Sequence, residues 1–483
     1  MKKYSRALYS LLFCALTAAM LYGAANLLRD RETTLASFYS EEKGSIDMAI
    51  VGSSHVNSGI IPNLFWEECN ISACNVYSWA QPMWTAYHYI VEALSEQDLD
   101  IVLLDLYGMT YGNSYIMPQE IDRVNYETSF NIDMNLNYLS LIHTAENVGL
   151  DLRPYEDFLN LPRYHTRWKK LNQRMFTYNP HDSKDFLKGY GISYTAQAQT
   201  QEAFSVSESV EPYEFCVEYL DKIVQLCEKE QVQLVFTMVP YIYNETEAGI
   251  DLWIEDYAAQ HGIPYISYIG KDASALKLDY ATDFQDNGHL NYYGAKKTTL
   301  DLAGRLKEMF PNYQKEQNPH RDQIDEDYAK YQRVVTSNQI MVENDLARYL
   351  EMALADENYI LYLVNSDSPV TDTVQAVLQQ HGIAVEDDRT FCAVLSAEGN
   401  SVNQWQLSVQ LFDKQGTVEF EAQSGDAQIY LNGVPVVSVD SSFKAVLYDK
   451  ILERPLETIA FDQETGKLSH KEFSSDIIGL FKK

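Results

Sequence analysis

The fold of this chain is decided by one stretch, Asp47-Met48-Ala49-Ile50-Val51-Gly52-Ser53-Ser54-His55. Its first part is apolar and its second part is made of small residues, so a short buried strand is predicted to run into a turn. In an open α/β sheet, the chemistry lies at the carboxyl ends of the strands. Ser54 stands at such an end, and it is therefore a candidate nucleophile.

The counterpart of this stretch lies far along the chain, at Asp286-Asn287-Gly288-His289. An Asp three residues before a His can orient the imidazole, which can then take a proton from a serine hydroxyl. We therefore predict a catalytic triad of Ser54, Asp286 and His289. In the structural alternative, Ser54 caps the next helix and His289 is an ordinary residue at a helix start. A second histidine, His55, adjoins Ser54 on the turn and is expected to point elsewhere.

Length and charge limit the class of protein. The chain has 483 residues, enough for about two or three domains. Its formal net charge of −32 argues against a nucleic-acid partner, because no basic surface would neutralise phosphates. The 35 tyrosines either fill strands and core or present rings to a sugar in a groove.

The six cysteines do not have the Cys-x-x-Cys spacing that is typical of metal sites, and we expect neither a metal nor a cofactor. Cys69 and Cys74 are close enough in sequence to form a small disulfide outside the cell. Buried free thiols are the alternative.

The N-terminus predicts a membrane anchor. Basic residues in the segment 1–6 precede an apolar run at 7–28, which is long enough to cross a bilayer as a helix. The charge distribution places residues 1–6 in the cytoplasm and the bulk of the chain outside the cell, on a single-pass anchor. A cleaved signal peptide is the alternative, given the small residues at 23–25.

Strands and helices alternate after the anchor, which predicts right-handed crossovers and a parallel sheet. A polar segment at 313–335 is interpreted as a linker, and a smaller α/β domain is predicted at 336–483. A long segment at 111–210 interrupts the alternation and is interpreted as a helical insertion over the mouth of the sheet. The predicted strands of the first domain are 47–52, 71–77, 101–106, 234–239 and 263–266, with helices at 82–95, 213–229 and 291–309.

The chain resembles the SGNH/GDSL hydrolases, which carry Gly-Asp-Ser after the first strand and Asp-x-x-His near the end of the domain. Gly52-Ser53-Ser54 matches with Ser53 in place of the Asp, and Asp286 to His289 matches fully. The resemblance covers roughly residues 45–310 and implies a three-layer α/β/α, flavodoxin-like domain at 45–312 with Ser54 as nucleophile. It is closest to the membrane-anchored branch with the D-alanyl transfer protein of teichoic acid synthesis and exopolysaccharide acetylation proteins.

In that family the oxyanion is held by the nucleophile's backbone N–H, a Gly of the second motif and an Asn of the third. The second motif here is Tyr77-Ser78-Trp79-Ala80-Gln81, without a Gly, and the third is Leu104-Asp105-Leu106-Tyr107-Gly108, without an Asn. Backbone N–H groups near Ala80 can substitute, which makes Ala80 and Gln81 candidates. Asp105 is either a residue of the cleft or a local cap or ion-pair partner.

A basic string in the insertion, His165-Thr166-Arg167-Trp168-Lys169, resembles one in the membrane-anchored branch. His165 and Arg167 are therefore candidates for binding an anionic or polyol acceptor; a solvated basic face is the alternative. Residues 340–470 also resemble the interleukin-like epithelial-to-mesenchymal inducer domain of cell-surface and glycan-related proteins, through their helix and strand order and Ala445-Val446-Leu447-Tyr448-Asp449-Lys450.

These resemblances imply an extracytoplasmic, membrane-anchored serine esterase or O-acyltransferase. Its substrates would be acyl esters of cell-surface glycans or teichoic acid, and a membrane protein that donates acyl groups would be a partner. The alternative is a non-catalytic glycan-binding or exopolysaccharide assembly protein with a degenerate site, which the missing Asn and Gly favour.

Overall fold

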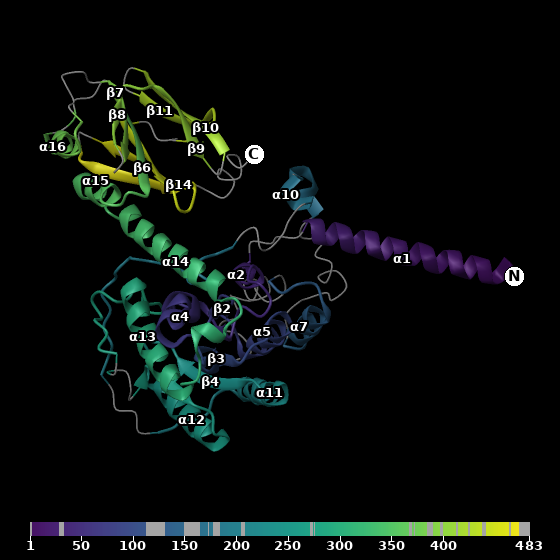
Figure 1. The fold of residues 1–483 in the computed structure, drawn as a ribbon. Coiled ribbons are helices and arrows are strands. Elements are labelled where there is room, and N and C mark those ends of the chain that lie inside the picture. The colour runs from purple at the N-terminus through teal and green to yellow at the C-terminus, as the bar shows by residue number, and fades with distance from the viewer. Residues whose placement is uncertain are drawn as a thin grey trace. The chain divides into compact units, whose positions relative to one another are not determined.

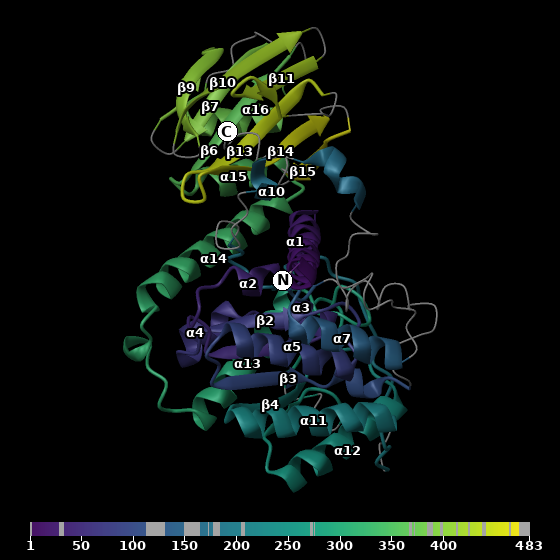
Figure 2. The ribbon, with the colours of Figure 1, turned by 90° about the vertical axis from the view of Figure 1, so that its right-hand side faces the viewer.

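The computed structural model divides the chain into two units, Met1–Glu326 and Asp327–Lys483, each with its own sheet or sheets (Figures 1 and 2). The described residues are 2–28, 33–112, 131–148, 165–171, 173–176, 184–203, 208–270, 274, 276–366, 370, 372–383, 390–396, 399–411, 414–423, 426–436, 441–462 and 465–472.

A parallel five-stranded sheet forms the centre of the first unit, as the sequence predicts. Its strands follow the order β2-β1-β3-β4-β5. This is the strand order of the flavodoxin type, in which ligands bind where the order reverses, between β1 and β3. Ser54 follows β1 directly, so it stands at that switch point. The strands are β1 (Met48–Gly52), β2 (Ala73–Tyr77), β3 (Ile101–Asp105), β4 (Gln233–Met238) and β5 (Tyr265–Ser267).

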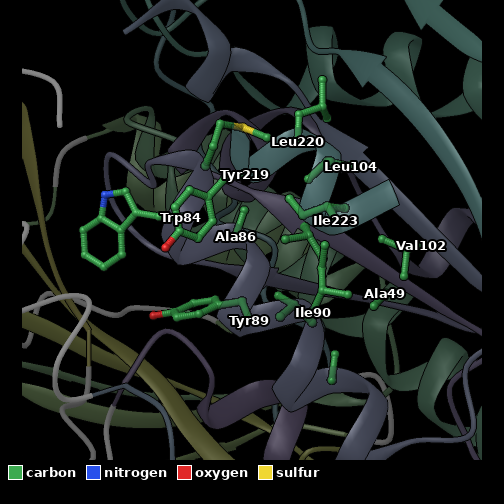
Figure 3. Close-up of a cluster of buried hydrophobic side chains, with 14 of the residues drawn as sticks. Ala49, Trp84, Ala86, Tyr89, Ile90, Val102, Leu104, Tyr219, Leu220 and Ile223 are labelled. Atoms are coloured by element: carbon green, nitrogen blue, oxygen red, sulfur yellow. The ribbon is translucent and has the colours of Figure 1, made fainter. Parts of the chain in front are cut away.

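Helices cover both faces of this sheet. Right-handed crossovers place the helix after β1 on one face and the helices after β2, β3 and β4 on the other. On the second face, side chains of α5 and α11 pack on Ala49, Val102 and Leu104 (Figure 3). The helices are α3 (Ser54–Gly59), α4 (Asn63–Cys69) and α13 (Tyr292–Met309) on the first face and α5 (Met83–Glu96), α11 (Glu214–Glu230) and α12 (Glu245–His261) on the second.

The N-terminal helix α1 (Lys2–Leu28) contains the predicted anchor. Its segment Ala7–Leu28 is long and apolar enough to cross a membrane. The apolar side chains of Leu12, Phe13 and Met20 are more than half exposed along it. A short helix, α2 (Ala36–Tyr39), follows and buries Phe38.

The insertion predicted at 111–210 is described only in part, since 113–130, 149–164, 172, 177–183 and 204–207 lie outside the described residues. Its helix α7 (Leu136–Asn147) packs on α5 through buried polar side chains. His88 of α5 lies 3.0 Å from Asn137 Oδ1 and 3.0 Å from Thr144 Oγ1. Glu92 accepts hydrogen bonds from Tyr39 (2.7 Å) and Asn137 (2.9 Å), which satisfy its buried carboxylate. The other described elements are η1 (Tyr107–Thr110), η3 (His165–Lys170) and α10 (Gln173–Phe176).

The end of the insertion returns to the sheet and supports the loop before α13. The backbone N–H of Gly191 donates to Asn57 O at 2.8 Å, and that of Tyr292 donates to Ser193 O at 2.7 Å. The N–H of Gln197 donates to Phe284 O at 2.8 Å. The loop that carries Asp286 and His289 is therefore joined to the returning segment close to both of its ends.

The segment 313–335, which the sequence indicates as a polar linker, contains η6 (Lys315–Gln317) and most of helix α14 (Arg321–Met341). Its first part bonds to the first unit. Trp66 Nε1 donates to Asp325 Oδ1 at 2.8 Å, and Tyr313 donates to Asp100 Oδ2 at 2.9 Å. The boundary between the units accordingly falls between Glu326 and Asp327.

The second unit contains two antiparallel sheets, of six strands (β15-β14-β13-β6-β7-β8) and four strands (β12-β11-β10-β9). Val418, Ile429 and Val446 belong to an apolar core between them, while α15 (Leu346–Leu354) and α16 (Asp372–Gln380) belong to a second core against the six-stranded sheet. The strands are β6 (Tyr359–Asn365), β7 (Phe391–Ser396), β8 (Ser401–Val402), β9 (Gln406–Leu411), β10 (Lys414–Gln423), β11 (Asp426–Leu431), β12 (Val434–Pro435), β13 (Phe443–Asp449), β14 (Arg454–Asp462) and β15 (Lys467–Glu472).

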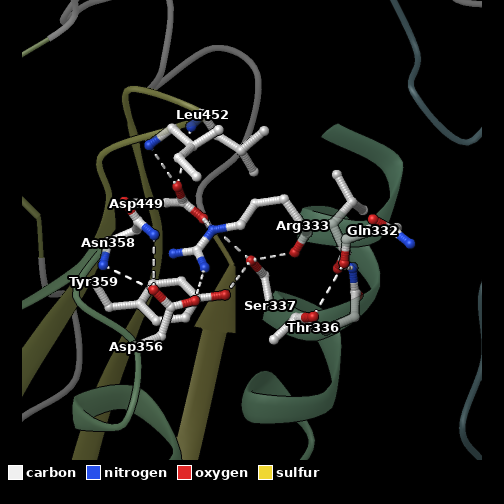
Figure 4. Close-up of polar contacts among 12 residues, drawn as sticks. Gln332, Arg333, Thr336, Ser337, Asp356, Asn358, Tyr359, Asp449 and Leu452 are labelled. Atoms are coloured by element: carbon white, nitrogen blue, oxygen red, sulfur yellow. Dashed lines mark hydrogen bonds and ion pairs between the residues drawn. The ribbon is translucent and has the colours of Figure 1, made fainter. Parts of the chain in front are cut away.

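A buried arginine joins α14 to the second unit (Figure 4). Arg333 Nε donates to Asp449 Oδ2 at 2.6 Å, and its Nη1 pairs with Asp356. The guanidinium carbon lies 3.6 Å from the centre of the Tyr359 ring. Asp449 is fully buried, so its charge is compensated mainly by Arg333 and by backbone N–H donors at the end of β13.

Candidate active site

Ser54 is the first residue of α3, and its neighbour Ser53 is the N-cap. The Ser53 hydroxyl accepts a hydrogen bond from the His55 backbone N–H at 3.3 Å. Asp and Ser are both good N-cap residues, so Ser53 can provide the cap at the position where the hydrolase motif has Asp. The structural alternative, in which Ser54 is the cap, is therefore wrong. The half-buried Ser54 side chain faces His289 instead.

The structure brings Ser54, His289 and Asp286 into one hydrogen-bonded line. His289 Nε2 lies 2.8 Å from Ser54 Oγ, across 235 residues of sequence. On the other side of the ring, His289 Nδ1 lies 2.9 Å and 3.0 Å from the two carboxylate oxygens of Asp286. A carboxylate accepts only, so it selects the tautomer with a proton on Nδ1. Nε2 is then free to accept the proton of the Ser54 hydroxyl.

The loop that carries Asp286 and His289 is held by backbone hydrogen bonds. Gln285 N donates to His289 O at 3.0 Å, and Ile242 N donates to Asn287 O at 2.8 Å. Gly288 N donates to Asp286 Oδ1 at 2.8 Å, which fixes the carboxylate. The Asp286 side chain remains 46% exposed and that of His289 30% exposed, so the site is accessible to solvent and to a substrate.

His55 does not point away from the site, contrary to the expectation from sequence. Its ring centre lies 5.5 Å from that of His289. The ring stacks on Tyr107 at 3.7 Å and meets Tyr241 edge to face at 5.0 Å. His55 is buried, and burial lowers its pKa well below the usual range. The reason is helical geometry: as the second residue of α3, His55 is directed differently from Ser54, inward over the end of β3.

Ala80 and Gln81 lie just past the end of β2, beside the end of β1. Ser78 N contacts Gly52 O at 3.4 Å, which keeps this segment next to the turn before Ser54. Gln81 Nε2 donates to Ser78 Oγ at 3.4 Å. Ala80 has a left-handed backbone with φ of +53°, which costs a non-glycine residue about 1–2 kcal/mol. Such strain clusters at functional sites, and here it sets the direction of backbone groups beside the turn.

Asp105 ends β3 and lies behind the turn. Its Oδ1 accepts from Val239 N at 3.1 Å, and burial raises the pKa of the carboxyl to about 7. A Cβ on Gly52 would stand 2.8 Å from Asp105 Cβ, so only glycine fits where β1 passes Asp105. No hydrogen bond among the described residues joins Asp105 to Ser54 or His289, and the structure does not place it in the triad line.

Among the described residues, no hydrogen bond or ring contact joins the basic string of the insertion to the triad. The string forms η3, which contacts α1, and Arg167 is partly buried there. The side chain of His165 lies outside the described residues.

Sequence reasoning missed Tyr107 and Tyr241. Each aromatic residue stands a few positions past an apolar run, after β3 and β4 respectively. Residues at that position of a parallel sheet line the edge where ligands bind, and this was a usable signal.

No protein-family model matches the chain, and no curated protein matches it. Among solved structures, a Bacteroides fragilis protein described as a "putative acylhydrolase" is similar over 57% of this chain and 94% of its own. Its sequence identity is 10% and its TM-score 0.28.

Proposed function

We propose that the chain is a membrane-anchored serine esterase or O-acyltransferase of the SGNH type, acting outside the cytoplasm on acyl esters of cell-surface glycans or teichoic acid. The observation that carries the proposal is the hydrogen-bonded line from Ser54 Oγ through His289 to Asp286. A nucleophile within hydrogen-bond reach of a base that a third group orients is the signature of nucleophilic catalysis.

In the first half-reaction, Ser54 Oγ attacks the ester carbonyl while His289 Nε2 takes the hydroxyl proton. The tetrahedral intermediate collapses, the bond to the leaving alcohol breaks, and His289 returns the proton to the alcohol oxygen. Asp286 stays ionised and stabilises the imidazolium that forms between these two transfers. The product is an acyl ester on Ser54.

In the second half-reaction, a water or a sugar hydroxyl attacks the acyl-Ser54 ester. His289 takes its proton and gives it back to Ser54 Oγ. Water gives hydrolysis and a sugar hydroxyl gives transfer, and the two outcomes differ in how well water is excluded. For transfer, a membrane protein that donates acyl groups would be the partner.

The oxyanion would be held by backbone donors. As the first residue of α3, Ser54 has an N–H with no acceptor inside the helix. The N–H of Ala80 is the second candidate, because its left-handed backbone lies beside the β1 turn. Gln81 can supply a side-chain amide from the same segment. Such donors are worth about two to three orders of magnitude each in rate.

Two features support a cell-envelope substrate: the apolar N-terminal helix and the resemblance to the membrane-anchored branch. Protease added to spheroplasts should digest the chain beyond residue 28 and leave the anchor in the membrane. A soluble form without residues 1–28 would show a cleaved signal instead.

A non-catalytic glycan-binding protein is the second candidate, because the second motif lacks the family's oxyanion Gly and the third motif lacks its Asn. A fluorophosphonate probe separates the two functions. The proposed enzyme should form an adduct on Ser54 and cleave p-nitrophenyl acetate, and Ser54→Ala should do neither. A folded wild-type chain that neither labels nor cleaves would favour the binding protein. If the chain does label and cleave, release of acyl groups from O-acylated envelope glycans would identify its substrate.

A further inference from the structure

The candidate site contains a second imidazole outside the hydrogen-bonded line. His55 is 3% exposed, and its buried Nδ1 has no hydrogen-bond partner among the described residues. Burying such an atom costs free energy, and each instance in a folded protein calls for an explanation. Since no hydrogen bond among the described residues fixes Nδ1, the ring of His55 is held mainly by the rings that it contacts.

Those neighbours are aromatic rings from the ends of different strands. The His55 and Tyr107 rings are nearly parallel, at 25°, with centres 3.7 Å apart. Tyr241 meets His55 at 62° and Tyr107 at 81°, with centres 5.0 Å away in both cases. The three rings make one rigid cluster next to the triad.

His289 joins this cluster edge to face. The His55 and His289 ring planes cross at 71°, with centres 5.5 Å apart. Among the described residues, Asp286 holds the Nδ1 side of His289, and nearly half of the Asp286 side chain is exposed. The Nε2 side is bonded to Ser54 Oγ, but this bond is lost when Ser54 is acylated, and the bonds at Nδ1 then leave the ring free to tilt about that edge. The contact with His55 limits this tilt.

We propose that His55 is a positioning residue, which holds the His289 imidazole by ring contact so that Nε2 stays within reach of Ser54 Oγ. This inference rests on the function proposed above. It assigns the work to the aromatic ring of His55 and not to its nitrogens.

The surroundings keep this ring uncharged. The titratable rings that it contacts are Tyr107 from η1, Tyr241 after β4 and His289 from the loop before α13. Burial and His289 lower the pKa of His55, while burial raises that of Tyr107 to about 12 and that of Tyr241 well above its usual value. A neutral ring is what the mechanism requires, since a second cation beside His289 would oppose formation of the imidazolium.

The test uses the full-length chain in detergent, with fluorophosphonate labelling of Ser54 and cleavage of p-nitrophenyl acetate as readouts. His55→Phe keeps a flat ring and removes both nitrogens, whereas His55→Ala removes the ring. We expect His55→Ala to lower kcat about twofold to tenfold with little change in KM. This factor corresponds to the free energy of one aromatic pair contact. His55→Phe should stay within about twofold of wild type, with the same acidic limb of its pH–rate profile.

His88 provides a matched control, since it is another buried histidine but lies between α5 and α7. His88→Ala should lower the melting temperature without changing the labelling rate of folded protein. A folded His55→Ala that labels at the wild-type rate would overturn the inference. So would a folded His55→Phe as slow as His289→Ala, because the nitrogens would then do the work. If the wild-type chain does not label, the proposed function fails and this inference fails with it.

Discussion

Removal of the Asp286 carboxylate should slow the enzyme by two to four orders of magnitude. In serine triads with a buried Asp, substitution by Asn costs about four orders of magnitude in kcat, because the imidazole is left in the wrong tautomer. Asp286 makes the same contacts to His289, at 2.9 Å and 3.0 Å, but is 46% exposed. Water can replace part of the stabilisation that the carboxylate gives to the His289 imidazolium. For Asp286→Ala, the loss in kcat should therefore be closer to about two orders of magnitude.

Asp286→Asn should be at least as slow as Asp286→Ala, although it is the smaller change. Its Oδ1 can still accept from Gly288 N, so the amide NH2 takes the place of Oδ2, which lies 3.0 Å from His289 Nδ1. An amide donor there favours a proton on Nε2, and such a ring cannot take the Ser54 proton.

The assay is the rate of p-nitrophenyl acetate cleavage by folded variants, with labelling of Ser54 as a second measure. Melting temperatures show whether each variant is folded. A loss of less than tenfold in both variants would refute the assignment of Asp286 as the group that orients His289. An Asp286→Asn enzyme clearly faster than Asp286→Ala would refute the tautomer argument.

Three further predictions concern stability. A chain ending at Glu326 should unfold cooperatively and melt at a higher temperature than one ending at Asn312, which loses the hydrogen bonds of residues 313–325; equal melting temperatures would contradict this. Arg333→Met should destabilise the second unit by about 3–5 kcal/mol in urea unfolding, because buried Asp449 loses its charged partner, and adding Asp449→Asn should recover part of that loss. Burial lowers the pKa of His88 from 6.5 to about 4, so the unfolded chain binds a proton between these values that the folded chain does not. The free energy of unfolding should therefore fall as the pH drops from 6.5 to 4, with His88 contributing up to about 3 kcal/mol. In a His88→Gln variant the same drop in pH should lower the free energy of unfolding by less.

The first unit could be predicted well because its buried strands are continuous apolar runs. Strands at 101–106 and 234–239 were visible for this reason, and the triad positions followed from where such strands end. β5 has only three residues, so its run is short, yet Ile263 to Ile266 still indicated it. The strands β14 and β15 were not predicted. β15 alternates between core and solvent, and in β14 the buried polar residues Glu457 and Thr458 interrupt the apolar run.

The ring cluster beside the triad could not be read from the sequence. Tyr107, Tyr241 and His55 follow three different strands, and only the strand order places them together. The role of Ser53 was also hidden, since a Gly-Ser-Ser turn does not say which serine caps the helix. The side chain of His55 was misplaced for the same reason: its direction depends on the residue at which α3 begins.

The distance along the chain between nucleophile and base has a consequence during synthesis. Ser54 and His289 are 235 residues apart, and the ribosome adds roughly 5–20 residues per second. For about 12 to 50 s the nascent chain therefore carries its nucleophile without a base. A truncated product that stops before residue 289 would contain Ser54 but not His289, so under the proposed function it should be inert toward esters.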